Sequence, residues 1–228
     1  RNGIVVGTGI TLSKDGDIFA TGITTSTGLT VNTDLSVGGA ITVNSITVGK
    51  GANSVAGNTV VGESALDAVT TGGNNVAIGL EALTANTTGD GHVSVGRYSL
   101  RGNTTGINNT AIGFNALKAN TTASNNTAIG NEALTLNTTG TRNTAVGNET
   151  LGATTTGYDN VAVGYRSLKA NTTGVQNTAV GSGALDAVTT QSYLTAVGYA
   201  ALSANTTGAA NIAVGYASLI KNTTGSYN

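Results

Sequence analysis

The chain has 228 residues, of which only 9% are charged, and its formal net charge at pH 7 is −1. This balance lacks the basic surface that nucleic acids and anionic membranes attract, so we expect no nucleic-acid partner and no membrane insertion. There is no cysteine, which excludes disulfides and cysteine-based metal sites.

Two further absences bear on the class of protein. The chain opens on Arg1 and contains no methionine, so we expect a piece of a longer product. It also contains no proline, whereas glycine accounts for 34 residues. Proline interrupts the hydrogen-bond ladder of a sheet and glycine supplies tight corners, so this composition favours continuous β structure over a flexible linker.

Residues 1–57 are predicted to form a thin β shaft of very short strands. Two strands are expected at 10–12 and 17–20, on either side of a turn at 14–16. Apolar–polar–apolar triplets then recur at steps of six, six and five residues, and they are 29–31, 35–37, 41–43 and 46–48. Alternation of this kind places both apolar side chains on one face of a strand. Such short strands bury little, so we expect this segment to intertwine with other copies of the chain.

Residues 58–228 consist of ten copies of a 17-residue repeat. Each copy contains a glycine at the same place, here called position 0: Gly62, Gly79, Gly96, Gly113, Gly130, Gly147, Gly164, Gly181, Gly198 and Gly215. A fixed period near 20 residues indicates a stacked architecture in which each copy meets only its neighbours. We therefore predict an all-β fold, a parallel β-roll or β-solenoid with one turn per repeat and turns ~4.8 Å apart.

The apolar positions of the repeat predict its interior. Position −1 is always Val or Ile and position +4 is always Leu, so both are assigned to the core, and the leucines Leu83, Leu100 and Leu117 are expected to stack in line. An aspartate in place of Ile129 is accordingly expected to put an unpaired charge into a narrow core. The small residues at −2 and +3 are expected to let separate chains approach. Segments such as 81–85 fit either β or turn structure or a single helical turn, and the first is favoured because so short a helix is unstable.

Asparagine recurs at position +7, followed by two threonines. We expect stacked carboxamides to pair from turn to turn in a ladder that includes Asn86, Asn103, Asn120 and Asn137. The alternative is N-glycosylation, because each Asn-Thr-Thr also fits the acceptor motif. The threonine pair itself favours strand, with one side chain inward and one outward.

Position +1 varies most from copy to copy, which indicates an exposed corner. Tyr165, Tyr199 and Tyr216 occupy it near the end of the chain and are expected to line up as an aromatic stripe. Tyrosine offers a flat face and a hydroxyl to glycans or proteins, so this stripe is a candidate contact surface. Plain stacking between turns is the alternative.

No residue pattern points to catalysis, to a cofactor or to a metal. His92 is the only histidine and stands where most copies have Asn, so we interpret it as a polar corner substitution. Asp15-Gly-Asp17 lacks the ligand spacing of a calcium loop, and Gly7-Thr-Gly9 lacks the context and lysine of a phosphate loop. We therefore expect a protein that is not an enzyme.

The unit Asn-Thr-Ala-Ile-Gly-x-x-Ala-Leu-x-x-Asn-Thr-Thr-Gly, seen at 126–140, resembles the repeats of phage tail-fibre proteins. Those repeats are often followed by an intramolecular chaperone that is cleaved off after trimerisation. More loosely, the unit is similar to the head repeats of trimeric autotransporter adhesins, which form parallel β-rolls. The resemblance covers residues 58–228.

This resemblance implies a homotrimeric fibre on a virion surface that acts as shaft or spacer in host attachment. Its expected partners are its own copies, other virion proteins on the N-terminal side, and possible glycans or proteins of the host surface. The alternatives are the head or stalk of a trimeric bacterial adhesin and, from another class, an ice-binding solenoid that displays one threonine of each pair per turn.

Overall fold

The structure is a computed structural model that describes residues 10–12, 18–20, 41–43 and 46–228. The chain divides into two units, Arg1–Val37 and Gly38–Asn228. In the first unit, β1 (Ile10–Leu12) and β2 (Ile18–Ala20) pair antiparallel, which confirms the two earliest predicted strands.

The predicted triplets at 29–31 and 35–37 lie outside the described residues, as do Gly7-Thr-Gly9 and Asp15-Gly-Asp17. The triplets at 41–43 and 46–48 are strands, as predicted, but they belong to the second unit.

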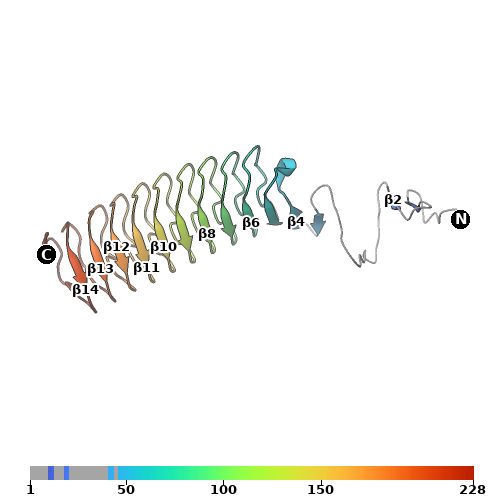
Figure 1. The fold of residues 1–228 in the computed structure, drawn as a ribbon. Helices are drawn as coiled ribbons and strands as arrows, with labels where there is room; N and C mark the ends of the chain where they lie inside the picture. Colours follow the sequence, from blue (N-terminus) through green and yellow to red (C-terminus); the bar gives the residue numbers. More distant parts are fainter. Residues whose placement is uncertain (1–9, 13–17, 21–40, 44–45) are drawn as a thin grey trace. The chain divides into compact units, whose positions relative to one another are not determined.

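The second unit contains one sheet that runs along the whole repeat region (Figure 1). It begins with β3 (Ile41–Val43) and β4 (Ile46–Gly49), which are antiparallel to each other, and β4 is antiparallel to β5. A short 3₁₀ turn, η1 (Ala52–Ser54), leads into the coil. The ten parallel strands are β5 (Thr59–Gly62), β6 (Val76–Ile78), β7 (Val93–Val95), β8 (Thr110–Ile112), β9 (Thr127–Ile129), β10 (Thr144–Val146), β11 (Val161–Val163), β12 (Thr178–Val180), β13 (Thr195–Val197) and β14 (Ile212–Val214).

Each strand pairs with the strand 17 residues later. Thr127 of β9 lies opposite Thr144 of β10, and Ala128 lies opposite Ala145, and the same register holds from β5 to β14. Main-chain hydrogen bonds continue between turns outside the strands, for example from Leu134 N–H to Thr150 O at 3.0 Å. The chain is therefore a parallel β-solenoid of about nine turns with one turn per repeat, as the 17-residue period predicted.

The core is a line of leucines facing a line of small residues. The leucine at +4 is fully buried in the first nine copies, and Leu83, Leu100 and Leu117 lie in the same place in successive turns. Alanine at −2, such as Ala128, and alanine at +3, such as Ala133, are also fully buried. Identical residues thus stack on identical residues along the coil.

The valine or isoleucine at −1 does not belong to this core, so that prediction was wrong. Ile129 is 38% exposed, whereas Ala128 beside it is fully buried. A three-residue strand points its middle side chain to one face and its two outer side chains to the other. The narrow interior takes alanine opposite leucine, and the larger residues therefore face outward. The alanines at −2 and +3, expected to let separate chains approach, instead line the interior of their own chain.

The segment between position 0 and the asparagine at +7 is a series of turns and not a helix. In the fifth copy, Ala133 N–H donates to Gly130 O and Asn137 N–H donates to Leu134 O. Glu132 and Leu134 adopt positive φ, 56° and 50°, and the leucine at +4 does so in every copy. This left-handed conformation costs an L-residue ~1–2 kcal/mol, so the burial of each leucine offsets a local strain.

Candidate functional site

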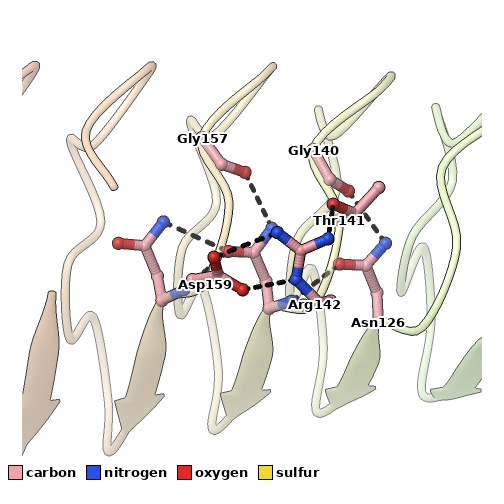
Figure 2. Close-up of polar contacts among 8 residues, drawn as sticks. Asn126, Gly140, Thr141, Arg142, Gly157 and Asp159 are labelled. Atoms are coloured by element: carbon pink, nitrogen blue, oxygen red, sulfur yellow. Dashed lines mark hydrogen bonds and ion pairs between the residues drawn. The ribbon is translucent and has the colours of Figure 1, made fainter. Parts of the chain in front are cut away.

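The residue at −4, directly before each strand, forms a buried polar ladder that sequence reasoning missed. Asn126 Nδ2 donates to Gly140 O at 2.9 Å, and Asn126 Oδ1 accepts from Asn143 N–H at 2.9 Å (Figure 2). The same two bonds recur at Asn143 and Asn160, so each carboxamide joins its own turn to the next. The signal in the sequence was the recurrence of Asn two positions before the alanine at −2, which places both on the inward face of the chain.

His92 replaces one asparagine of this ladder and is fully buried. Its Nδ1 accepts from Asn109 N–H at 3.2 Å, so the neutral ring carries its proton on Nε2, which donates to Gly106 O at 2.7 Å. Burial lowers the pKa of His92, and the hydrogen bond to Gly106 O and the nearby Asp90 carboxylate oppose that shift. A second proton on Nδ1 would face the Asn109 N–H, so the neutral ring is the form that fits. His92 is thus a ladder residue in the interior and not a substitution at an exposed corner.

The asparagines at +7 form a second buried ladder. Asn103 Nδ2 donates to Asn86 Oδ1 at 2.8 Å, Asn120 Nδ2 to Asn103 Oδ1 at 2.8 Å, and Asn137 Nδ2 to Asn120 Oδ1 at 3.1 Å. All four side chains are fully buried, and each also donates to a carbonyl three residues later in its own turn. These amides are engaged in the interior and are therefore poor acceptors for a glycan.

This second ladder has two gaps. Thr154 takes the place of Asn, and its hydroxyl donates to Asn171 O, which leaves the buried Asn137 Oδ1 without a partner. Val188 interrupts the ladder again, and Asn171 Oδ1 is likewise unpaired. A buried carbonyl oxygen without a donor costs ~1–3 kcal/mol, so these gaps are local weak points.

The threonines after the second ladder form bends and not the strand that was predicted. The first hydroxyl of each pair bonds to the next turn, as when Thr104 Oγ1 donates to Thr121 O at 3.1 Å and Thr121 Oγ1 donates to Thr138 O at 3.2 Å. These side chains are half-buried or exposed, with none directed into the core. Their hydroxyls serve cohesion between turns.

Ion pairs connect turns on the outside of the coil. Arg142 binds Asp159 with two bonds, Nε to Oδ1 at 2.6 Å and Nη2 to Oδ2 at 3.0 Å (Figure 2). This hydrogen bonding lowers the pKa of Asp159 and raises that of Arg142. Lys169 likewise lowers the pKa of Glu149 through its ion pair. Exposed pairs of this kind contribute little to stability and mainly keep neighbouring side chains in order.

The outer face of the parallel sheet carries no charge. Its outward positions, −3 and −1, hold only Thr, Val and Ile on all ten parallel strands. Examples are Ile78, Ile112 and Val180, which are each more than a third exposed. We call this surface the strand face. It extends nine strand spacings along the coil and about three residues across, so its projected area is ~430 Å² at ~4.8 Å per strand and ~3.3 Å per residue.

The structure places the three predicted tyrosines at exposed corners on one side of the coil. Tyr165, Tyr199 and Tyr216 are 52%, 57% and 80% exposed. Tyr199 and Tyr216 belong to successive turns and stack, with ring centroids 5.3 Å apart and planes 11° apart. Ser182 occupies position +1 in the turn between Tyr165 and Tyr199. Tyr165 and Tyr199 border a groove of about 260 Å³. The structure thus brings together one stacked pair and one separated pair.

Two other grooves lie beside Leu136, which is 52% exposed and stands where most copies have alanine. Their volumes are about 500 and 400 Å³, and Thr135 and Leu136 border both. Arg101 and Lys118 also border the first groove, and Glu132, Glu149 and Lys169 border the second.

Among the described residues there is no cluster of three or more His, Cys, Asp or Glu side chains placed to hold a metal ion. Nor does this part of the chain contain a helix with the length and hydrophobicity to span a bilayer. Comparison with protein-family models, with curated proteins and with solved structures gave no match. The strand face and the groove beside Tyr165 and Tyr199 are therefore the candidate functional surfaces.

Proposed function

We propose that this chain is a structural protein of a virion attachment fibre, such as a phage tail fibre, in which three copies form a shaft or spacer. The observation that carries this proposal is the uncharged strand face. The footprint of this face, ~430 Å² with valines, isoleucines and threonines exposed on it, is comparable to the largest apolar patches on monomeric proteins, ~300–600 Å², and such patches often mark interaction sites.

A second copy of the chain is the partner that fits the strand face best. The face is repeated at every turn, so its complement is another surface with the same repeat. Three such faces directed to a common axis cover the valines and isoleucines of every copy. The interior of each coil already contains its own leucines and alanines, so assembly adds a second apolar layer without rearranging the first.

The coil suits a spacer because its cohesion is distributed evenly. Each turn is joined to the next by main-chain bonds and, in most turns, by the carboxamides at −4 and +7, with His92 and Leu194 as the exceptions at −4. A rod built in this way repeats the same contacts along its length and can be lengthened by adding turns.

The test is the mass of the full chain in solution. Sedimentation equilibrium at micromolar concentration should give three times the 22.3 kDa of one chain. Replacing Ile129 with Asp should reduce the mass to that of a monomer that keeps its far-UV circular dichroism, because the new charge lies on the strand face. Thr139→Asp, at an exposed corner of the same turn, is the control and should remain trimeric. A wild-type monomer would remove the proposal.

A trimeric bacterial adhesin uses the same assembly, and sequence neighbouring this chain separates the two: virion genes support the fibre, and an outer-membrane anchor supports the adhesin. An ice-binding role has one observation of its own, the threonines at −3 on six of the ten parallel strands, although valine or isoleucine interrupts them on the other four. That role needs an uncovered face, so it predicts a monomer with thermal hysteresis.

A further inference from the structure

The groove between Tyr165 and Tyr199 has aromatic walls and a floor of small residues. Tyr165 and Tyr199 occupy position +1 two turns apart, and the turn between them presents Ser182 and Gly183. The two tyrosines are therefore separated by ~10 Å, two strand spacings. The stacked rings of Tyr199 and Tyr216, one turn apart, show that a ring-shaped group fits at each turn of this corner. The small side chain of Ser182 leaves space between Tyr165 and Tyr199, and the Arg166 guanidinium lies over the Tyr165 ring, 6.0 Å from its centroid.

The edge of the groove carries a donor and an acceptor that only partly satisfy each other. Arg166 Nη2 lies 3.7 Å from Asp186 Oδ2, which is longer than a hydrogen bond. Arg166 Nε is buried and has no hydrogen-bond partner among the described residues, so the outer guanidinium nitrogens, on a side chain that is 39% exposed, are the donors that a ligand can reach. Arginine only donates and a carboxylate only accepts, so a group that accepts from one and donates to the other completes both. A hydroxyl can accept from Arg166 and donate to Asp186, and two adjacent hydroxyls on a ring offer two such groups.

We propose that this groove binds one pyranose ring of a glycan, with its faces against Tyr165 and Tyr199 and its hydroxyls between Arg166 and Asp186. The flat ring faces meet the tyrosines, and the polar edge meets the charged pair. This proposal deepens the proposed attachment function and rests on it for the setting, since it names the class of host ligand and the turns that bind it.

The test measures binding of methyl glycosides to the full chain by saturation-transfer NMR. The probes are methyl glycosides of common hexoses, N-acetylhexosamines and 6-deoxyhexoses, with N-acetyltyrosinamide as the planar aromatic comparison. At least one glycoside should bind with a dissociation constant of about 1 mM, as expected for a single small ring. Tyr165→Ala and Tyr199→Ala should each weaken binding about tenfold, since each removes one stacking face.

Two further variants make the test specific to the groove. Ser182→Tyr fills the gap with the residue that three other turns carry at this position, so it should fold normally and abolish binding. Tyr193→Ala removes an equally exposed tyrosine at a different corner and should leave binding unchanged.

The proposal is overturned if no glycoside binds, if Ser182→Tyr binds as well as the wild type, or if N-acetyltyrosinamide binds better than every glycoside. The last result would identify the groove as a site for an aromatic side chain of a protein. The mass of the same sample separates this test from that of the fibre. A trimer without glycoside binding contradicts only the groove, and a monomer that binds contradicts only the fibre.

Discussion

Replacing Gly79 with alanine tests whether the glycine at position 0 is required by the contact between turns. Gly79 has φ +129°, and a Cβ there would lie 2.7 Å from Gly96 O, 2.8 Å from Gly96 C and 3.2 Å from Arg97 N. Gly215 has nearly the same φ, +124°, but no atom lies within 4 Å of its Cβ position, because no further repeat follows it in this structure. The two positions therefore share the backbone strain and differ in the clash.

The strain of an L-residue in this region costs ~1–3 kcal/mol. The clash at Gly79 is with main-chain atoms that cannot rotate away, and overpacking of this kind adds ~1–3 kcal/mol. We therefore expect Gly79→Ala to lose ~2–6 kcal/mol of unfolding free energy and Gly215→Ala only the strain, ~1–3 kcal/mol.

Urea unfolding followed by circular dichroism, at one protein concentration for all variants, measures both losses. Hydrogen exchange at the amide of Gly96, which donates to Ile78 O at 2.8 Å, reports whether the turns separate locally. Equal losses for the two variants, with unchanged exchange at Gly96, would refute the assignment of this glycine to close contact between turns.

Three further predictions concern single positions. His92→Asn restores the usual ladder residue. The pKa of His92 is lower in the folded chain than its unfolded value of ~6.5, so the wild-type stability is complete above pH ~6.5 and falls as the pH drops towards the folded pKa. Urea midpoints at pH 7.5 and pH 5 should therefore show a smaller loss of stability in the variant than in the wild type. At position +2, Gly183 has φ +67° and Ala200 has φ +52°, so Gly183→Ala should destabilise and Ala200→Gly should stabilise by about 1 kcal/mol each in the same assay, and shifts of the same sign would contradict the strain argument. Thr154→Asn should raise the urea midpoint by supplying a donor to the unpaired Asn137 Oδ1, worth about 1 kcal/mol or more, and a lower midpoint would show that the gap is better left as threonine.

The sequence predicted the solenoid because a constant 17-residue period places residues 17 apart over one another when each repeat forms one turn. It also predicted the buried line of Leu83, Leu100 and Leu117. It did not predict which side of the strand faces inward. Hydrophobicity alone assigns Ile129 to the core, whereas the narrow interior of the coil accommodates the smaller Ala128 instead. The width of that interior depends on turn conformations that local propensity does not reveal.

The candidate site was predicted only in part. The corner tyrosines were found because the variability of position +1 indicates exposure. The groove beside Tyr165 depends on Arg166 and Asp186, which are brought together by the stacking of neighbouring turns. Neither residue recurs at its position in most copies, so the repeat pattern gave no signal for them.

The central claim is that three copies meet through the strand face, and cysteine crosslinking tests it most directly because the chain has no cysteine of its own. Val146→Cys places one thiol on the strand face, and Thr139→Cys places one at an exposed corner. Under mild oxidation, the account predicts a disulfide-linked dimer band for Val146→Cys, since equivalent thiols meet near the common axis, and almost none for Thr139→Cys. A monomer band alone for Val146→Cys, or equal crosslinking of the two variants, would contradict it.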